Sequence, residues 1–163
     1  MRFRLGSRLR IRSVASLVPF ALAAFFVAPT PAAYAASCGP VTAGDVVAAT
    51  PYLSTAYGPI AHGVQASSGA WGAARPGLYS PLTGGFNPTG SNLAVVNASW
   101  GQNWSVASSD GVNAVFCGYV ILSSPYGQVV YGVQYSGSQG RWGNFNRSSN
   151  LFYPDNGGWH PLA

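Results

Sequence analysis

The most regular hydrophobic pattern of the chain lies in its C-terminal half. Within residues 129–135, Val129, Tyr131, Val133 and Tyr135 fall on one face of a strand, and the residues between them fall on the other. Residues 112–122 are almost continuously apolar, which indicates a strand buried on both faces. Pro and Gly in 123–127 are typical of a turn, so residues 112–135 predict a β-hairpin.

Two further runs, 93–99 and 141–145, predict strands, and the Asp-Asn-Gly-Gly segment at 155–158 predicts a turn. Residues 36–91 are rich in Gly, Pro, Ala and Ser, and predict turns, short strands and at most one helix. We place that helix at 43–49, with Thr42 as its N-cap, Asp45 in its first turn and Thr50-Pro51 at its end. We therefore interpret residues 36–91 as an irregular half and residues 92–153 as the core of the sheet.

Together these elements predict a mainly β protein. We expect one small domain over residues 36–163, built as an antiparallel β-sandwich or compact β-sheet with at most one short helix. Trp-Gly occurs three times, at Trp71, Trp100 and Trp142, but the spacings are unequal and the flanking residues differ. We therefore expect no internal repeat behind these dipeptides.

The first 35 residues have the layout of a cleavable secretory signal peptide. Five Arg lie within residues 2–12, an uncharged apolar run covers 14–28, and Ala33-Tyr34-Ala35 resembles a cleavage site. The apolar run is shorter than the roughly 20 residues that a membrane-spanning helix needs. Processing after Ala35 would export residues 36–163 to the periplasm, the cell surface or the medium, with no transmembrane segment in the mature chain.

This signal also changes the meaning of the charge. The whole chain carries a formal net charge of +5, with eight Arg and three Asp and neither Lys nor Glu. Residues 36–163 keep three Arg and three Asp and are therefore neutral. A nucleic-acid partner is not expected, because binding to phosphates depends on a surplus of basic side chains.

The two cysteines, Cys38 and Cys117, allow one intramolecular disulfide, which an oxidising compartment favours. In the chain-entropy description a loop of this length contributes about 4 kcal/mol to the free energy of unfolding. The alternative is a buried thiol at Cys117 and an unpaired Cys38.

Acid–base chemistry has few residues to use. Outside the signal the chain offers His62, His160 and three separated Asp, and it has no Gly-x-Ser-x-Gly motif, metal-ligand spacing or phosphate-binding loop. We expect no enzyme, no catalytic residues, no cofactor and no metal. A small secreted hydrolase is the second alternative to the function given below.

Aromatic residues among Asn, Gln, Ser and Gly are the positive functional signal. Two such segments occur, 97–105 and 141–147. Ring faces beside neutral amides and hydroxyls are suited to glycans, since rings stack on the apolar face of a sugar and amides bond its hydroxyls. The expected ligand-binding residues are Trp100, Asn103, Trp104, Trp142 and Asn144. The alternative for any single Trp is a place in the core.

The sequence thus predicts an exported, non-catalytic recognition domain that binds a glycan or another component of the cell envelope. A second hypothesis is a self-assembling structural or adhesive envelope protein, because a surface with so few charges is poorly protected against self-association. In that case the chain would form homo-oligomers.

Overall fold

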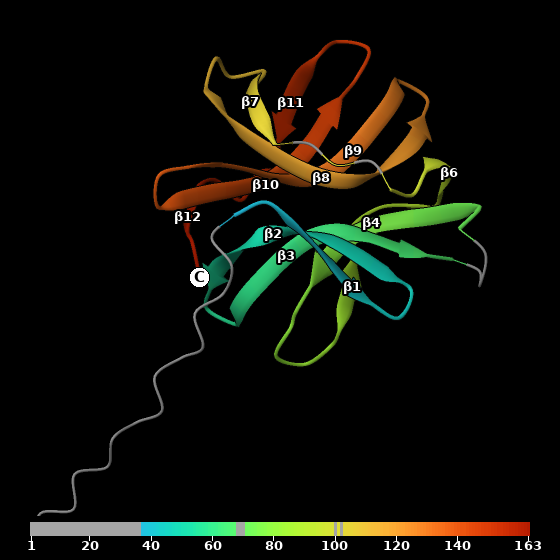
Figure 1. Ribbon diagram of the computed structural model, residues 1–163, viewed down its shortest axis with the longest axis horizontal. Coiled ribbons are helices and arrows are strands. Elements are labelled where there is room, and N and C mark those ends of the chain that lie inside the picture. Colours follow the sequence, from blue (N-terminus) through green and yellow to red (C-terminus); the bar gives the residue numbers. More distant parts are fainter. Residues whose placement is uncertain (1–36, 68–70, 100, 102) are drawn as a thin grey trace, which may run out of the picture. The chain divides into compact units, whose positions relative to one another are not determined.

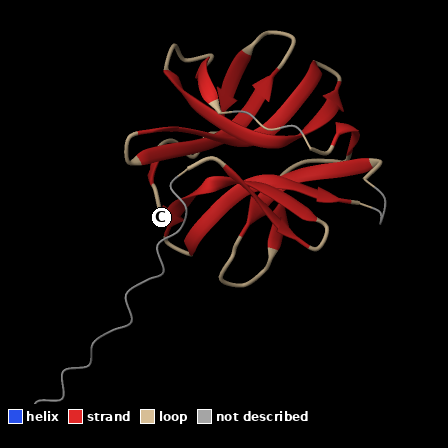
Figure 2. Cartoon of the chain, viewed as in Figure 1, coloured by secondary structure: helices blue, strands red, loops and turns tan. Residues whose placement is uncertain are grey.

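The computed structural model describes residues 37–67, 71–99, 101 and 103–163 (Figures 1 and 2). These residues belong to a single unit, Ala32–Ala163, and form twelve strands. The strands are β1 Gly39–Ala43, β2 Val46–Thr55, β3 Gly58–Ala66, β4 Ala73–Tyr79, β5 Phe86–Pro88, β6 Leu93–Asn97, β7 Trp104–Ala107, β8 Asn113–Ser124, β9 Gly127–Ser136, β10 Gln139–Asn146, β11 Leu151–Pro154 and β12 His160–Pro161. The described residues contain no helix that could cross a membrane. The expected mainly β, antiparallel fold is confirmed.

All twelve strands belong to one sheet that folds into two layers (Figure 1). Its order is β1-β2-β3-β4-β6-β8-β9-β10-β11, with β5 beside β4, β7 beside β8 and β12 beside β10. Strands β1 to β5 form one layer and β7 to β11 the other. The strand β6 connects the layers at one side by pairing with both β4 and β8. At the other side β12 pairs with β10, and Leu162 bridges to Leu53 of β2.

The two layers are two copies of one arrangement, β1 to β6 and β7 to β12. In each copy five strands follow one another as a meander, and a sixth short strand reaches the second strand of the other copy. The connecting strands β6 and β12 pair in the same register in both copies. Pairs Ala73↔Ala94, Ala74↔Leu93 and Val95↔Leu122 in the first copy match Gln139↔Pro161, Gly140↔His160 and Leu162↔Leu53 in the second. Because each copy contacts the other through equivalent strands, the relation is an approximate two-fold symmetry.

The duplication is visible in the sequence once the structure shows where to align it. Residues 53–67 align without a gap with 122–136, and more than half of the aligned pairs are identical. The identical pairs are Leu53/Leu122, Ser54/Ser123, Tyr57/Tyr126, Gly58/Gly127, Gly63/Gly132, Val64/Val133, Gln65/Gln134 and Ser67/Ser136. The Trp-Gly dipeptides are not among them, since the counterpart of Trp142 is Pro76. Our expectation that those dipeptides mark no repeat stands, but an internal repeat of another kind exists.

Equivalent side chains also make equivalent bonds. In the first copy, Arg75 donates from Nε and a terminal nitrogen to Oε1 of Gln65, at 3.1 and 2.6 Å. In the second, Arg141 donates in the same way to Gln134, at 3.0 and 2.8 Å. A pair of this kind crosses between the third and fourth strand of each copy and therefore fixes the same register twice.

Two equivalent glycines, Gly63 and Gly132, let neighbouring strands approach more closely than a side chain permits. A Cβ at Gly63 would collide with the carbonyl oxygen of Val47, and one at Gly132 with the carbonyl oxygen of Cys117. Gly132 also pairs with a glycine on either side, Gly118 on β8 and Gly143 on β10. The three glycines form a row across the second layer, and glycine within a strand favours a bend.

Each layer has an outer core, and the layers share the core between them. The first outer core contains Val46, Tyr52, Ala61, Tyr79 and Phe86, and the second contains their counterparts Phe116, Ile121, Val130, Phe145 and Phe152. Between the layers, Leu53, Val133 and Trp142 pack around Cys117, which forms the predicted disulfide with Cys38. The disulfide therefore joins the two copies covalently.

Two expectations for residues 36–91 are wrong. The segment 43–49 is not a helix but the end of β1, a turn at Gly44 and the start of β2. Gly44 has a φ of 60°, which opposes a right-handed helix, and the paired Val46 and Val47 favour a strand. The half is also not irregular, because it supplies five strands of the sheet. Its prolines interrupted the strand pattern in the sequence, but most lie on the edge strand β1, near strand ends or at the bulge of β2 near Pro51. Pro76 is inside β4, between the residues of β4 that pair with β6 and those that pair with β5.

Arg141 makes further contacts besides its hydrogen bonds to Gln134. Arg141 is buried and also donates to both carboxylate oxygens of Asp110 and to the hydroxyl of Ser108. Its guanidinium lies over the ring of Trp159, 4.6 Å from the centroid. The guanidinium, followed by the Ser108 hydroxyl, holds the pKa of Asp110 well below its usual range. This carboxylate anchors the β7–β8 turn to β10.

We predict that Gly132→Ala destabilises the protein by about 3 kcal/mol or more, because the added methyl group has no space unless β8 moves. The matched control is Gly72→Ala, at a turn position where an added Cβ meets nothing within 4 Å. We expect the control to change the free energy of unfolding, measured in urea, by less than about 0.5 kcal/mol. Equal stability of the two variants would contradict the close approach.

We predict that Asp110→Asn makes stability less dependent on pH in the acid range. A carboxylate whose pKa is lowered by folding stabilises the protein above its unfolded pKa of about 4, and this contribution is lost as the pH falls through that value and below. Melting temperatures measured from about pH 5 to 2 should therefore fall less steeply in the variant than in wild type. The control Asp45→Asn removes the same charge away from Arg141, and an equal change in both variants would argue against a specific role for Asp110.

Candidate functional site

Two adjoining hollows lie where the β5–β6 loop of the first copy faces β9, β10 and β11 of the second. Their volumes are about 600 and 560 Å³, and they share Pro76, Gly90, Tyr131 and Asn144 in their walls. We refer to both together as the groove. Its two ends differ in chemistry, and we call them the tyrosine end and the acidic end.

The tyrosine end combines ring faces with neutral polar groups. Tyr126 is 85% exposed and Tyr153 is 39% exposed, and both line this end. Between them Asn146 donates from Nδ2 to the carbonyl oxygen of Tyr126 at 3.0 Å, which holds the β8–β9 turn against the end of β10. The hydroxyls of Ser91 and Ser124 complete this wall. The arrangement offers stacking surfaces and hydrogen-bonding groups without a charge.

The acidic end is built around a buried histidine. His62 lies on β3 with 1% of its surface exposed, and its Nδ1 is 3.2 Å from the carbonyl oxygen of Gly132 on β9. Asp155, directly after β11, places Oδ2 3.8 Å from the same Nδ1 and stays half exposed. The ring of Tyr131 meets His62 edge to face, with centroids 5.6 Å apart. Among the described residues, Asp155 is the only charged side chain in the walls of the groove.

Burial determines the protonation of this end. It lowers the pKa of His62, against the opposing effects of Asp155 and the Gly132 carbonyl, so the imidazole is neutral. A neutral ring whose Nδ1 donates to Gly132 carries a lone pair on Nε2, and that atom is buried with no hydrogen-bond partner in the structure. Burial, with Asp155 second, raises the pKa of Tyr131, whose phenol keeps its proton. The close approach of His62 and Asp155 is therefore not an ion pair.

The internal symmetry shows what the groove would be if both copies had kept the same residues. The counterparts of Pro76 and Asn144, which line the groove, are Trp142 and Leu78 in the equivalent region. Trp142 is buried there, stacks on His160 with centroids 4.8 Å apart, and packs in the same core cluster as Leu78. At the acidic end the equivalent residues lie together, because Thr89, the counterpart of Asp155, and His62, the counterpart of Tyr131, line the same hollow. The tyrosine end is thus open and polar, while its counterpart is filled with apolar side chains.

The structure separates the residues predicted to bind a ligand. Trp100 lies outside the described residues. Trp104 on β7 is 53% exposed, and Asn103 beside it is exposed and accepts a hydrogen bond from the hydroxyl of Tyr135 at 3.5 Å. Asn144 lines the groove instead, and Trp142 is buried in the core between the layers.

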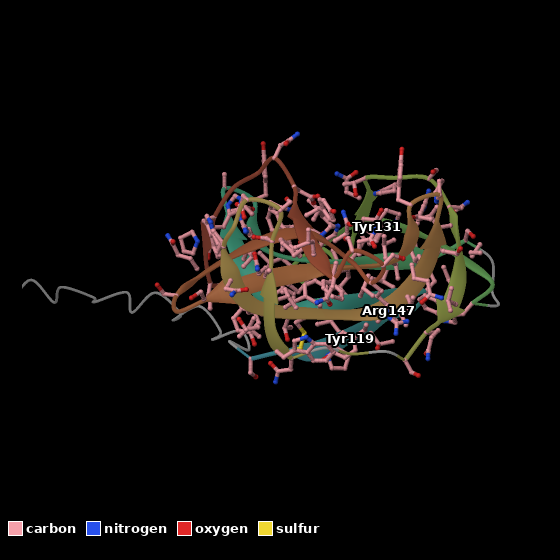
Figure 3. The ribbon with its side chains drawn as sticks, turned by 90° about the horizontal axis from the view of Figure 1, so that it is seen from above. Tyr119, Tyr131 and Arg147 are labelled. Carbon is pink, nitrogen blue, oxygen red and sulfur yellow. A yellow bond between two sulfur atoms is a disulfide. The ribbon has the colours of Figure 1, made fainter. Side chains whose placement is uncertain are left out.

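The surface around Trp104 and the groove are different places. Gly101, three residues before Trp104, lies against Tyr119, which is beside the disulfide. Figure 3 shows Tyr119 and the sulfur atoms at the opposite side of the view from Tyr131, which lines the groove. The groove brings together polar side chains from distant segments of the chain, and it is our candidate site.

The described residues hold no cluster of three or more His, Cys, Asp or Glu that could bind a metal ion. At the acidic end, the 3.8 Å between His62 and Asp155 is longer than a hydrogen bond, and Nδ1 is bonded to Gly132. This geometry does not orient His62 by a carboxylate as in a catalytic dyad. The groups present are suited to binding.

Sequence reasoning missed His62, Tyr131 and Asp155 of the acidic end, and also the stacking residues Tyr126 and Tyr153 of the tyrosine end. His62 carried no motif, Tyr131 was one of several alternating strand residues, and Asp155 was interpreted as part of a turn. The signal that could have found the first two is the alignment of 53–67 with 122–136. It places His62 opposite Tyr131, each directly followed by an identical Gly-Val-Gln.

No family model, no curated protein and no solved structure matches this chain.

Proposed function

We propose that residues 36–163 form an exported recognition domain whose groove binds a neutral, polyhydroxylated ligand, namely a glycan chain. The single observation that carries the proposal is the asymmetry between the copies. The tyrosine end of the groove is open and lined by rings, amides and hydroxyls, whereas Trp142 and Leu78 fill the equivalent region with apolar groups. A purely structural duplication would have no reason to keep one of the two regions open.

The side chains of the groove support a sugar ligand over other small molecules. Tyr126 and Tyr153 provide faces on which the C–H groups of a sugar ring can stack, and Asn144 provides an amide for its hydroxyls. The volumes of about 600 and 560 Å³ are in the range of ligand-binding clefts, and each can hold a sugar unit with its neighbours. A phosphorylated ligand is disfavoured, because no Arg among the described residues lines the groove.

Export is part of the same proposal. It rests on the predicted signal peptide and on the disulfide between Cys38 and Cys117, which persists in an oxidising compartment. Glycans of envelopes and matrices are the polyhydroxylated polymers that an exported domain meets.

We predict that wild type binds neutral oligosaccharides on a glycan array, and that two variants which copy the filled region prevent it. Pro76→Trp places a ring in the groove like the one that Trp142 places in the equivalent region. Asn144→Leu replaces an amide of the groove by the side chain that Leu78 has at the equivalent position. Titration calorimetry with the strongest array ligand should show a loss of at least about tenfold for each variant, with melting temperatures near wild type. Binding should persist at high salt, because stacking is not screened as ion pairs are.

The comparison variant is Trp104→Ala, which removes an exposed ring outside the groove. Normal affinity in this variant supports the groove. If Trp104→Ala abolishes binding while Pro76→Trp and Asn144→Leu do not, the surface predicted from the sequence is the site and the groove is not. If no glycan is bound and the protein forms concentration-dependent oligomers in light scattering, the proposal is replaced by self-assembly.

A further inference from the structure

The acidic end of the groove differs from the tyrosine end in offering hydrogen-bond acceptors and a negative charge, and this difference indicates which kind of glycan it prefers. Resting on the proposed glycan function, we propose that this end is a subsite for a primary ammonium group, so that the preferred glycan contains an amino sugar with an unacetylated amine. The inference depends on which groups at this end accept hydrogen bonds and on where the positive charges of the protein are.

The acceptors are concentrated on Asp155 and His62. Asp155 presents a half-exposed carboxylate at the rim. His62 lines the same end, and its Nε2 is a buried acceptor without a partner, because Nδ1 is bonded to the carbonyl oxygen of Gly132. An ammonium group carries three hydrogen-bond donors and no acceptor. It is therefore the sugar substituent whose donors match the acceptors of Asp155 and His62.

No positive side chain of the described residues competes for Asp155. Arg75 is bonded to Gln65, Arg141 to Gln134 and Asp110, and Arg147 to Gln128, and none of the three lines the groove. Asp155 therefore leaves this end of the groove with an unbalanced negative charge. A ligand ammonium group balances this charge through a charge-assisted hydrogen bond, whereas a uronic acid would be repelled.

The symmetry gives an independent argument. The counterpart of Asp155 is Thr89, which also lines this end, so one wall has an uncharged hydroxyl where the other has a carboxylate. Both residues follow the fifth strand of their copy, and the backbone nitrogen of each donates to the fourth strand, Thr89 to Pro76 and Asp155 to Trp142, at 2.9 Å. The turn is thus built in the same way without a carboxylate, and the charge of Asp155 is not needed to form it.

The test uses three tetrasaccharides of the same linkage as probes, made of glucosamine, of N-acetylglucosamine and of glucose. Their affinities for the full mature chain are measured by calorimetry at about pH 6, where the amines carry a proton. We expect the glucosamine tetrasaccharide to bind about fivefold more tightly than the other two, as a half-exposed ion pair provides. This preference should decrease as salt is raised, while the binding of the glucose tetrasaccharide should not.

Asp155→Asn should reduce the preference, measured as the ratio of the affinities for the glucosamine and glucose tetrasaccharides, to within about twofold. The matched control Asp45→Asn removes the same charge outside the groove and should keep the preference. Equal affinities of wild type for all three probes would overturn the ammonium subsite and leave the glycan groove standing. A preference that survives in Asp155→Asn, or that is lost equally in Asp45→Asn, also overturns the subsite. If none of the probes and no array glycan binds, the proposed function itself fails.

Discussion

Neither copy of the repeat completes its own sheet, and this mutual dependence determines the architecture. The short strand β6 leaves the first copy and pairs with β8, and β12 leaves the second copy and continues to β2 through Leu162. Each copy therefore covers an edge that the other would expose to solvent. The apolar residues between the layers, including Leu53, Val133 and Trp142, become a core only when both copies are present. The disulfide then adds a covalent bond across the same boundary.

The close backbone approaches at Gly63 and Gly132 occur at equivalent positions of the two layers. Most pairs of equivalent residues described above also make equivalent contacts. Gln65 and Gln134 hold their arginines alike, and the two outer cores use side chains at equivalent positions. Differences in chemical type stand out against this background. They are largest at the tyrosine end of the groove, where Asn144 corresponds to Leu78 and Pro76 to Trp142. The symmetry of the fold thus serves as an internal reference, against which the candidate site is the place of divergence.

Much of the second copy could be predicted from the sequence, because alternation in 129–135 and the apolar run in 112–122 are direct consequences of strand burial. The disulfide was predictable for a different reason, since two cysteines allow one pairing. The first copy was underestimated because Pro51 and its other prolines interrupt the pattern, although a sheet tolerates proline at edges and bulges. The site was out of reach because it depends on long-range register. Nothing local in the sequence brings His62 to Gly132 or Asp155 to either of them. For Trp142 the sequence pattern was ambiguous, because an aromatic residue among polar neighbours is as compatible with the core as with a surface.

Trp142 also has a consequence for the number of ligands that one chain can hold. A perfectly symmetric duplication would carry two equivalent tyrosine ends. Because the Trp142 ring occupies the second region, symmetry does not generate a second tyrosine end. Under the proposed function, a single chain therefore binds one polymer strand at this site and does not cross-link two.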